Sequence, residues 1–395
     1  MATSERLELH SSLRDQSMLL AAAGMLTMAT ALGIDRFVYT PILPLMAEAT
    51  SLSTAQAGLI ASANFLGYLV GALAAAKAEL PGSRRGWLIA TLAVSALSTG
   101  GTALASSLPE FLIVRFVGGA AGAFAIVIAI ALVVERLAAE GRSSLLAVHF
   151  GGVGIGIAVS AALVSGLLAM GSGWRLLWVA ASVISLSFTA LVAVFIAQEP
   201  TSRQAVASRG DTQVRPGFWA LIIANGLSSF GYVTTATFLV AMVRRSPELK
   251  PLEAWIWIVF GLATAPSVAA WTWVGSRTGI ARALSLAYLV EAAGVALSVL
   301  WSAETGMIIA TVFVGATFIA NTALGMMAAR ALWSGDARRP VALMTAAFGL
   351  GQIAGPTFAG VLHDVLGSFL LPSLIAASGL LVGALLVGRL KTPGL

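Results

Sequence analysis

The amino-acid sequence predicts an all-α integral membrane protein with twelve transmembrane helices in two six-helix halves. Three observations support this fold class. The 395 residues are 58% hydrophobic and only 10% charged, whereas soluble domains carry about 25% charged residues. Apolar runs of about 20 residues, the length that crosses a bilayer as a helix, repeat along the chain. The basic residues gather in the loops between these runs, mainly on alternate sides.

Twelve apolar runs predict twelve helices, and the ends of each helix are predicted to within a few residues. The first six are expected at 17–46, 55–78, 86–106, 109–135, 143–170 and 174–198. The second six are expected at 217–243, 253–274, 280–301, 304–330, 339–364 and 368–390. Residues 199–216 are polar and flanked by prolines, which indicates a cytoplasmic linker between an N-terminal bundle (17–198) and a C-terminal bundle (217–390). Residues 1–16 and 391–395 are expected to be cytoplasmic tails.

The distribution of basic residues predicts the orientation in the membrane. Of the 23 Lys and Arg residues, 17 fall in the tails and even-numbered loops, and four fall in the opposite loops. The remaining two, Arg36 and Arg115, lie within predicted helices. Because positively charged loops stay in the cytoplasm, both termini are expected there, in a multi-pass protein of a bacterial inner membrane.

The composition argues against several classes of function. The chain has no cysteine and its three histidines are far apart, so neither a metal site nor a cofactor is expected. No phosphate-binding loop of the form Gly-x-x-x-x-Gly-Lys-Ser/Thr is present, so ATP is not expected to drive this chain. The net charge of +6 arises from loops beside a bilayer, and no nucleic-acid partner is expected.

The first apolar run carries charge at membrane depth. An uncharged stretch from Met18 to Ile34 is followed by Asp35 and Arg36. A charged side chain at the bilayer centre costs about 3 kcal/mol on insertion scales, so Arg36 is expected to face a wet cavity or a protein interior. We interpret it as a binding residue for substrate or an anion, since a guanidinium offers a fixed fork of donors. The alternative is a structural pair with a carboxylate or with carbonyls freed near Pro41.

Polar side chains at helical spacing extend this interpretation to other helices. A polar stripe within an apolar span must bond a neighbouring helix or line a cavity, because lipid offers no partner. The predicted substrate-binding set is Arg36, Tyr39, Asn64, Tyr68, Arg115, Asn225, Tyr232, Asn321 and Gln352. For each amide and tyrosine, bonding between helices remains the alternative to lining a cavity. Arg115 could equally extend to the membrane surface or bond a helix end.

Three ionisable residues are candidates for proton coupling. Asp35 could load and release a proton, since burial favours the neutral form of a carboxyl group. It neighbours Arg36 in sequence and therefore points to a different helix face. Glu291 stands midway along the ninth predicted helix, where pairing with a neighbouring helix or a dimer contact is the alternative. His149 in the fifth is expected to have a hydrogen-bonded packing role, with a proton relay as the alternative.

Glycine is enriched at helix faces that are expected to pack closely. There are 41 glycines, about 10% of the chain against a usual ~7%. Small residues four apart let helices approach each other where hydrophobicity cannot drive association. The predicted packing or gating positions are Gly118, Gly122, Gly152, Gly156, Gly351, Gly355 and Pro356.

Four stretches give the chain a resemblance to a known family. They read Gly33-Ile34-Asp35-Arg36-Phe37-Val38-Tyr39 with Leu43-Pro44, Gly152-Val153-Gly154-Ile155-Gly156-Ile157-Ala158, Gly315-Ala316-Thr317-Phe318, and Gly351-Gln352-Ile353-Ala354-Gly355-Pro356 followed by Gly360 and Asp364. In their order and spacing the chain resembles a major facilitator superfamily transporter of the YbfB/YjiJ-type branch. The resemblance covers nearly the whole chain. It implies the major facilitator fold, with a midplane substrate site between two halves that rock against each other.

Two positions depart from the family pattern. The loop after the second helix carries Ala75 where the family has an aspartate, and Asp35 stands where a glycine is usual. In the family, the missing aspartate belongs to a charge cluster that latches the cytoplasmic side. That latch is therefore not expected here in its usual form. Arg115 with Gly119 and Gly122 does resemble the Arg-led glycine motif of the fourth helix.

We therefore expect a secondary active transporter that moves a small organic molecule by alternating access. The resemblance implies coupling to protons and favours efflux over uptake. The alternative is a proton-coupled uptake permease for a small organic anion. A membrane enzyme would need a convergent set of nucleophile, base or metal, which is not visible. A sensor would need a soluble output domain. The expected partners are the substrate, protons and lipid, and the protein is expected to be a monomer.

Overall fold

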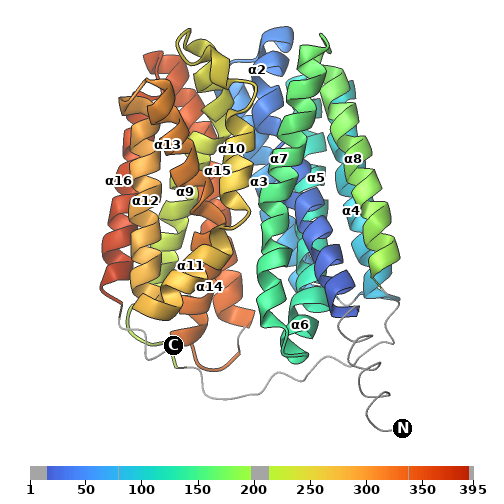
Figure 1. Cartoon of the computed structure of the whole chain (residues 1–395), viewed down its shortest axis with the longest axis vertical. Helices are drawn as coiled ribbons and strands as arrows, with labels where there is room; N and C mark the ends of the chain where they lie inside the picture. Colours follow the sequence, from blue (N-terminus) through green and yellow to red (C-terminus); the bar gives the residue numbers. More distant parts are fainter. Residues whose placement is uncertain (1–15, 79, 197–212, 337, 391–395) are drawn as a thin grey trace.

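The computed structural model describes residues 16–78, 80–196, 213–336 and 338–390, and within these ranges it consists of helices packed side by side (Figure 1). Within the described ranges, eleven helices are long and apolar enough to cross a membrane, and there are twelve spans if one bent pair of helices is counted as a single span. The predicted tails 1–16 and 391–395 and linker 199–216 lie almost entirely outside the described residues.

The first six spans, called here the N-half, end within a few residues of the predicted positions. They are Gln16–Thr50, which contains the π-helix η1 (Ala29–Ile34) and α2 (Tyr39–Thr50), then α3 (Thr54–Lys77), α4 (Arg84–Gly101, continued to Leu104), α5 (Leu108–Ala129) with η3 (Ile130–Val134) and α6 (Glu135–Ala139), α7 (Leu146–Ala169) and α8 (Trp174–Phe195).

The last six spans, called here the C-half, include two that are broken midway. They are α9 (Phe218–Arg245), α10 (Ile256–Thr264) with α11 (Ser267–Thr278), α12 (Ile280–Leu300), α13 (Glu304–Gly315) with α14 (Phe318–Ala331), α15 (Arg338–Leu366) and α16 (Leu370–Gly388). The sequence predicted the continuous spans 253–274 and 304–330 but neither break.

The first span is irregular where its charged residues begin. In η1 the Asp35 amide donates to the Thr30 carbonyl at 2.9 Å, five residues back, so the helix is locally widened. Pro41 has no amide N–H, so the series of helical hydrogen bonds is interrupted there. The Thr40 amide donates to the carbonyl of Phe37 rather than to that of Arg36. The carbonyls of Asp35 and Arg36 are thereby left for side chains to satisfy.

The two breaks in the C-half lie next to each other. The pair α10 and α11 bends by 43° at Ala265–Pro266, and α13 and α14 are separated by Ala316 and Thr317. Thr264 Oγ1 donates to the Gly315 carbonyl, and Trp271 Nε1 donates to the Ala316 carbonyl, both at 2.9 Å. The carbonyls exposed by the break in the tenth span are therefore satisfied by the eighth.

Backbone approaches without intervening side chains join the halves. A Cβ at Gly58 of α3 would overlap the Pro356 carbonyl of α15, and a Cβ at Gly154 of α7 would overlap the backbone of α10 at Gly261 and Ala265. Because lipid is as apolar as the helix surfaces, no hydrophobic effect drives helices together in a membrane, and close backbone packing of this kind holds them together instead. The predicted glycines lie at close contacts within one half: Gly118 beside α4, Gly122 beside the first span and α4, Gly152 and Gly156 against the first span, and Gly351 and Gly355 against α9.

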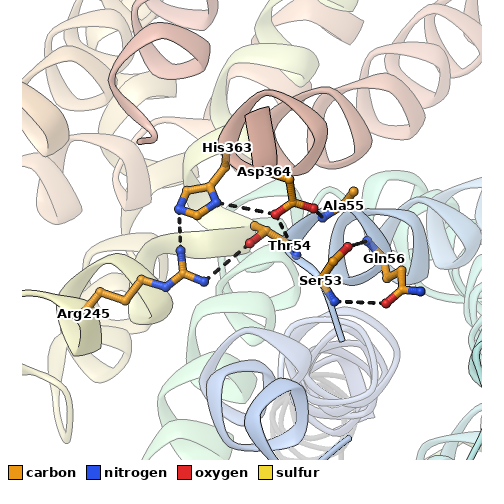
Figure 2. A network of polar contacts seen from close by, with 7 residues as sticks. All are labelled: Ser53, Thr54, Ala55, Gln56, Arg245, His363 and Asp364. Atoms are coloured by element: carbon orange, nitrogen blue, oxygen red, sulfur yellow. Dashed lines mark hydrogen bonds and ion pairs between the residues drawn. The ribbon is translucent and has the colours of Figure 1, made fainter. Parts of the chain in front are cut away.

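A polar network closes one end of the bundle, which we call the Ser53 end (Figure 2). Asp364 of α15 accepts the Thr54 amide at 3.1 Å and the Ala55 amide at 2.8 Å, so a carboxylate of one half caps the first turn of α3 in the other. Arg245 of α9 contacts His363 and the Thr54 hydroxyl. At the opposite, Gln16 end, the ribbons of the two halves diverge (Figure 1).

Candidate functional site

Arg36 lies just after η1, and its side chain borders the interface between the halves. The residue is 6% exposed, and among the described residues its guanidinium has no ion pair and no partner for Nε or Nη2. Its Cζ lies over the ring of Phe65 at 4.4 Å and over that of Tyr68 at 4.7 Å, both on α3. Aromatic faces partly compensate a buried cation, but they leave its N–H donors free for an anion.

Aromatic rings of the C-half complete this environment. Phe37 contacts Phe318 of α14 with ring centroids 5.6 Å apart and Trp257 of α10 with centroids 6.4 Å apart. The ring centroid of Tyr232 on α9 lies 5.0 Å from that of Phe318. Both halves therefore meet at the residues that follow Arg36. Phe65, Phe318 and Trp257 are not among the residues predicted from the sequence, because an aromatic residue in an apolar span looks the same there whether it faces lipid or a neighbouring helix.

A small space lies beside Arg36 on the side of the Ser53 end. It measures about 20 Å³, and its polar lining includes Thr40, Asn64, Arg115 and Thr237. That volume holds roughly one water molecule. A larger ligand that reached this lining would have to displace side chains or move the halves apart.

Arg115 is held by the first span. Its Nη1 donates to the Asp35 carbonyl at 2.8 Å and its Nη2 to the Arg36 carbonyl at 3.0 Å, the two carbonyls left over by the distorted backbone. Trp178 and Tyr39 lie beside the guanidinium, with ring centroids 5.3 and 5.5 Å from Cζ. The freed carbonyls considered as partners for Arg36 are thus bonded by Arg115.

The other predicted binding residues bond neighbouring helices. Tyr39 Oη donates to the Ala57 carbonyl at 2.7 Å, and Asn64 Nδ2 donates to the Arg115 carbonyl at 2.9 Å. In the C-half, Asn225 Nδ2 donates to the Met344 carbonyl at 2.9 Å, and Gln352 Nε2 donates to Tyr232 Oη. Tyr68 lies against the Arg36 guanidinium, and Tyr39 and Asn64 line the small space with it, whereas Asn225 and Asn321 do not line that space.

Asp35 and Glu291 are two buried carboxyl groups in different halves. Asp35 Oδ1 accepts the Ser185 hydroxyl of α8 at 2.6 Å, and Oδ2 has no partner among the described residues. Asp35 and Arg36 are not paired, as expected from their adjacent positions. Glu291 Oε2 accepts Ser228 Oγ at 3.1 Å and Asn321 Nδ2 at 3.0 Å, and therefore joins α12 to α9 and α14.

His149 is fully buried one turn into α7. Its ring meets Phe150 edge-on with centroids 4.9 Å apart, and a side chain at Gly24 of the first span would clash with it. Neither ring nitrogen has a hydrogen-bond partner in the described part of the chain. The ring is packed against its neighbours, and the hydrogen bond expected for it is not formed within the described residues. The described residues contain no group of three or more metal-ligating side chains.

Solved transporters share this arrangement of helices. A crystal structure of the nucleoside transporter NupG (D323A mutant) superposes with a TM-score of 0.75 at 13% identity, covering 94% of this chain and 98% of that one. An inward-facing, unoccupied bacterial homologue of the human lysosomal transporter Spinster gives a TM-score of 0.67 at 16% identity, with 94% of each chain covered. At these identities the likeness establishes the fold alone.

The sequence also matches one family directly. No curated protein matches the chain, but the family described as uncharacterised MFS-type transporter YbfB matches residues 28–388. The predicted all-α fold, the resemblance and the assignment as a transporter rather than an enzyme are thereby confirmed. The chain belongs to this YbfB family of major facilitator superfamily transporters, multi-pass membrane proteins whose arrangement is consistent with secondary transport by alternating access.

Proposed function

We propose that this transporter carries a small organic anion and binds its charged group at Arg36. The observation that carries the proposal is the guanidinium at the interface of the halves, with free N–H donors and no counter-ion among the described residues. A carboxylate would accept from the planar fork in a bidentate manner. Phe65, Tyr68 and Phe318 would pack against an apolar or aromatic body.

The closed Ser53 end supports alternating access. There, one half caps a helix of the other through Asp364, and the contact of Gly58 with Pro356 lies one turn into the same helix. Opening that end breaks a few polar contacts between the halves and exposes backbone amides to water, at a modest cost. We place both termini in the cytoplasm of a bacterial inner membrane, which makes the Ser53 end the periplasmic one and this conformation closed to the periplasm.

Proton coupling and the direction of transport are the finer parts of the proposal. The resemblance to the family supports a proton gradient as energy source, with Asp35, His149 and Glu291 as the buried candidates, and it favours efflux. Proton-coupled uptake of the same anion is the second candidate, supported by the attraction of Arg36 for a carboxylate. Transport by a monomer is part of the proposal.

A thermal-shift comparison tests the binding chemistry directly. Purified protein is heated with matched pairs of probes, such as benzoic acid with benzamide and nicotinic acid with nicotinamide, near neutral pH. We expect acids to raise the unfolding temperature while their amides do not, because only the ionised probe can pair with Arg36. Equal shifts from acids and amides, or shifts that survive Arg36→Ala, would contradict binding at this guanidinium.

Cysteine labelling tests the orientation, because the native chain has no cysteine. Single cysteines replace Ser208, which lies outside the described residues, and Ser246, which follows α9 near the Ser53 end. In intact cells a membrane-impermeant maleimide is expected to label Ser246→Cys only, and Ser208→Cys only after lysis. Labelling of both from one side would overturn the proposed topology.

A further inference from the structure

Glu291 occupies a polar cluster that the anion site does not use. It is fully buried on α12, and its contacts are Ser228 of α9, Asn321 of α14 and Thr317 in the break between α13 and α14. No Lys, Arg or His in the described part of the chain pairs with it. An ionised carboxylate without a counter-charge costs several kcal/mol at this depth.

The arrangement of donors and acceptors fits a proton better than a metal ion. Asn321 presents its NH₂ group to Oε2 at 3.0 Å, and a donor group cannot ligate a cation. Thr317 Oγ1 lies 3.4 Å from Oε1, but its single hydroxyl proton has a closer acceptor, the Phe313 carbonyl at 2.7 Å. A proton carried on Oε1 can therefore point at the Thr317 oxygen.

Thr317 connects this carboxyl group to the anion site. It lies in the break of the tenth span, where the carbonyls of Gly315 and Ala316 are already bonded by the eighth span. The next residue, Phe318, contacts Phe37 across the interface, and Phe37 follows Arg36 in the first span. A change at Glu291 thus has a short, contiguous route to Arg36 through packed side chains.

We propose that Glu291 is the proton-binding site of this transporter, and that its protonation state sets the geometry of the break at Ala316–Thr317. Loss of the proton would place a charge beside Thr317 and Asn321 and pull their hydroxyl and amide donors toward the carboxylate. Phe318 would move with them and alter its contact with Phe37. This inference rests on the proposed proton-coupled transport and names the residue that binds the proton.

The surroundings favour Glu291 over the other buried carboxyl group. Asp35 has a cation nearby, the Arg115 guanidinium bonded to its own main-chain carbonyl, which opposes the effect of burial on its side chain, whereas no such cation lies beside Glu291 in the described part of the chain. The titratable groups that interact electrostatically with Glu291 are Tyr288 on its own helix and Tyr232 on α9. The described parts of α11, α13, α14 and α16 bring no charged side chain to it.

Infrared difference spectroscopy of full-length protein in lipid nanodiscs tests the proposal without a known substrate. A protonated carboxyl group gives a carbonyl-stretching band that shifts in D₂O and disappears on ionisation. We expect this band, titrating with pH, in the wild type and in the matched control Glu304→Gln, whose parent residue is exposed at the start of α13. Glu291→Gln is expected to lose it. A band that survives Glu291→Gln and is lost in Asp35→Asn would overturn the proposal.

A second readout follows the break itself. Trp271 bonds the Ala316 carbonyl, so its fluorescence, measured in a variant that keeps this tryptophan alone, should titrate together with the infrared band. Glu291→Asp keeps a carboxyl group and should shift that titration, which covers the case in which Glu291→Gln does not fold. A titration displaced by sodium at constant pH would overturn the proton assignment. Arg36→Ala should keep both the infrared band and the titration of Trp271 fluorescence. A variant that loses anion binding but keeps both signals would have lost only the anion site at Arg36.

Discussion

Arg36 and Arg115 are buried in the same half of the protein, yet within the described residues only Arg115 donates side-chain hydrogen bonds to the protein, through both of its Nη atoms. Their exposures are 6% and 2%, and both guanidinium groups lie against aromatic rings. Arg115 donates to two carbonyls of the first span, whereas Arg36 lacks acceptors for Nε and Nη2 among the described residues. Burial alone does not separate a structural charge from a binding charge. The number of hydrogen-bond acceptors within reach of each guanidinium separates the two.

The difference has a local cause. The π-helix and Pro41 leave two carbonyls without backbone partners on the face that meets α5, and Arg115 fills them. Arg36 comes from the same irregular segment, but its side chain points toward α3, where rings and not carbonyls surround it. One distortion of the backbone therefore fixes one arginine and leaves the other available.

The largest effect in a test of this difference between the two arginines is expected at Arg36. Arg36→Ala should reduce substrate transport in proteoliposomes by about 100-fold or more, because a desolvated charge partner of the anion is removed. Membrane insertion should be intact, since no protein hydrogen bond is lost. Arg36→Lys should recover only part of the activity, because an ammonium group lacks the planar fork. Full transport by Arg36→Ala would remove the site assignment.

Arg115→Ala should act on stability instead. It removes two charge-assisted hydrogen bonds of about 1.5–3 kcal/mol each and leaves two buried carbonyls unsatisfied, so the unfolding temperature in detergent should fall by several degrees. Arg115→Lys should restore part of this loss. If Arg115→Ala left the unfolding temperature unchanged and abolished binding of the acid probes, Arg115 would belong to the anion site as the sequence predicted.

The third prediction concerns Asp364, a carboxylate of the C-half that accepts hydrogen bonds from backbone amides of the N-half. Asp364 caps α3 from α15, and such a contact is worth about 0.3–1 kcal/mol, up to ~2 kcal/mol when partly buried. Asp364→Asn should therefore shift the equilibrium toward opening of the Ser53 end by roughly two- to fivefold without unfolding the protein. A cysteine at Ala61, buried at the small space beside Arg36, reports this as faster maleimide labelling.

A matched control keeps that measurement specific. Glu248→Gln changes an exposed carboxylate near the same end and should leave the labelling rate of the Ala61 cysteine unchanged. An equal rate in the Asp364→Asn and Glu248→Gln backgrounds would mean that the cap does not hold the halves together. In that case the ion pair between Glu48 of α2 and Arg244 of α9, together with glycine contacts such as Gly58 with Pro356, would hold this end closed.

Much of the fold follows from the sequence because a bilayer imposes the same requirement on every span. Helix ends such as those of α12 (280–300, expected at 280–301) follow from local hydropathy. The breaks at Pro266 and Thr317 do not, because each is stabilised by donors from another span. The sequence marked Asp35, Arg36 and Glu291 as exceptional, since charge in an apolar run is itself the signal.

The class of protein, the number of spans and the residues that carry unusual charge all follow from the amino-acid sequence. The tertiary structure decided the partner of each: Arg115 bonds the first span, Glu291 meets the break of the tenth, and Arg36 lacks acceptors for two of its nitrogens. The reason is physical. Transfer of a helix into lipid depends on its own composition, whereas a side chain's hydrogen bonds depend on how neighbouring helices are rotated and where their backbones are broken.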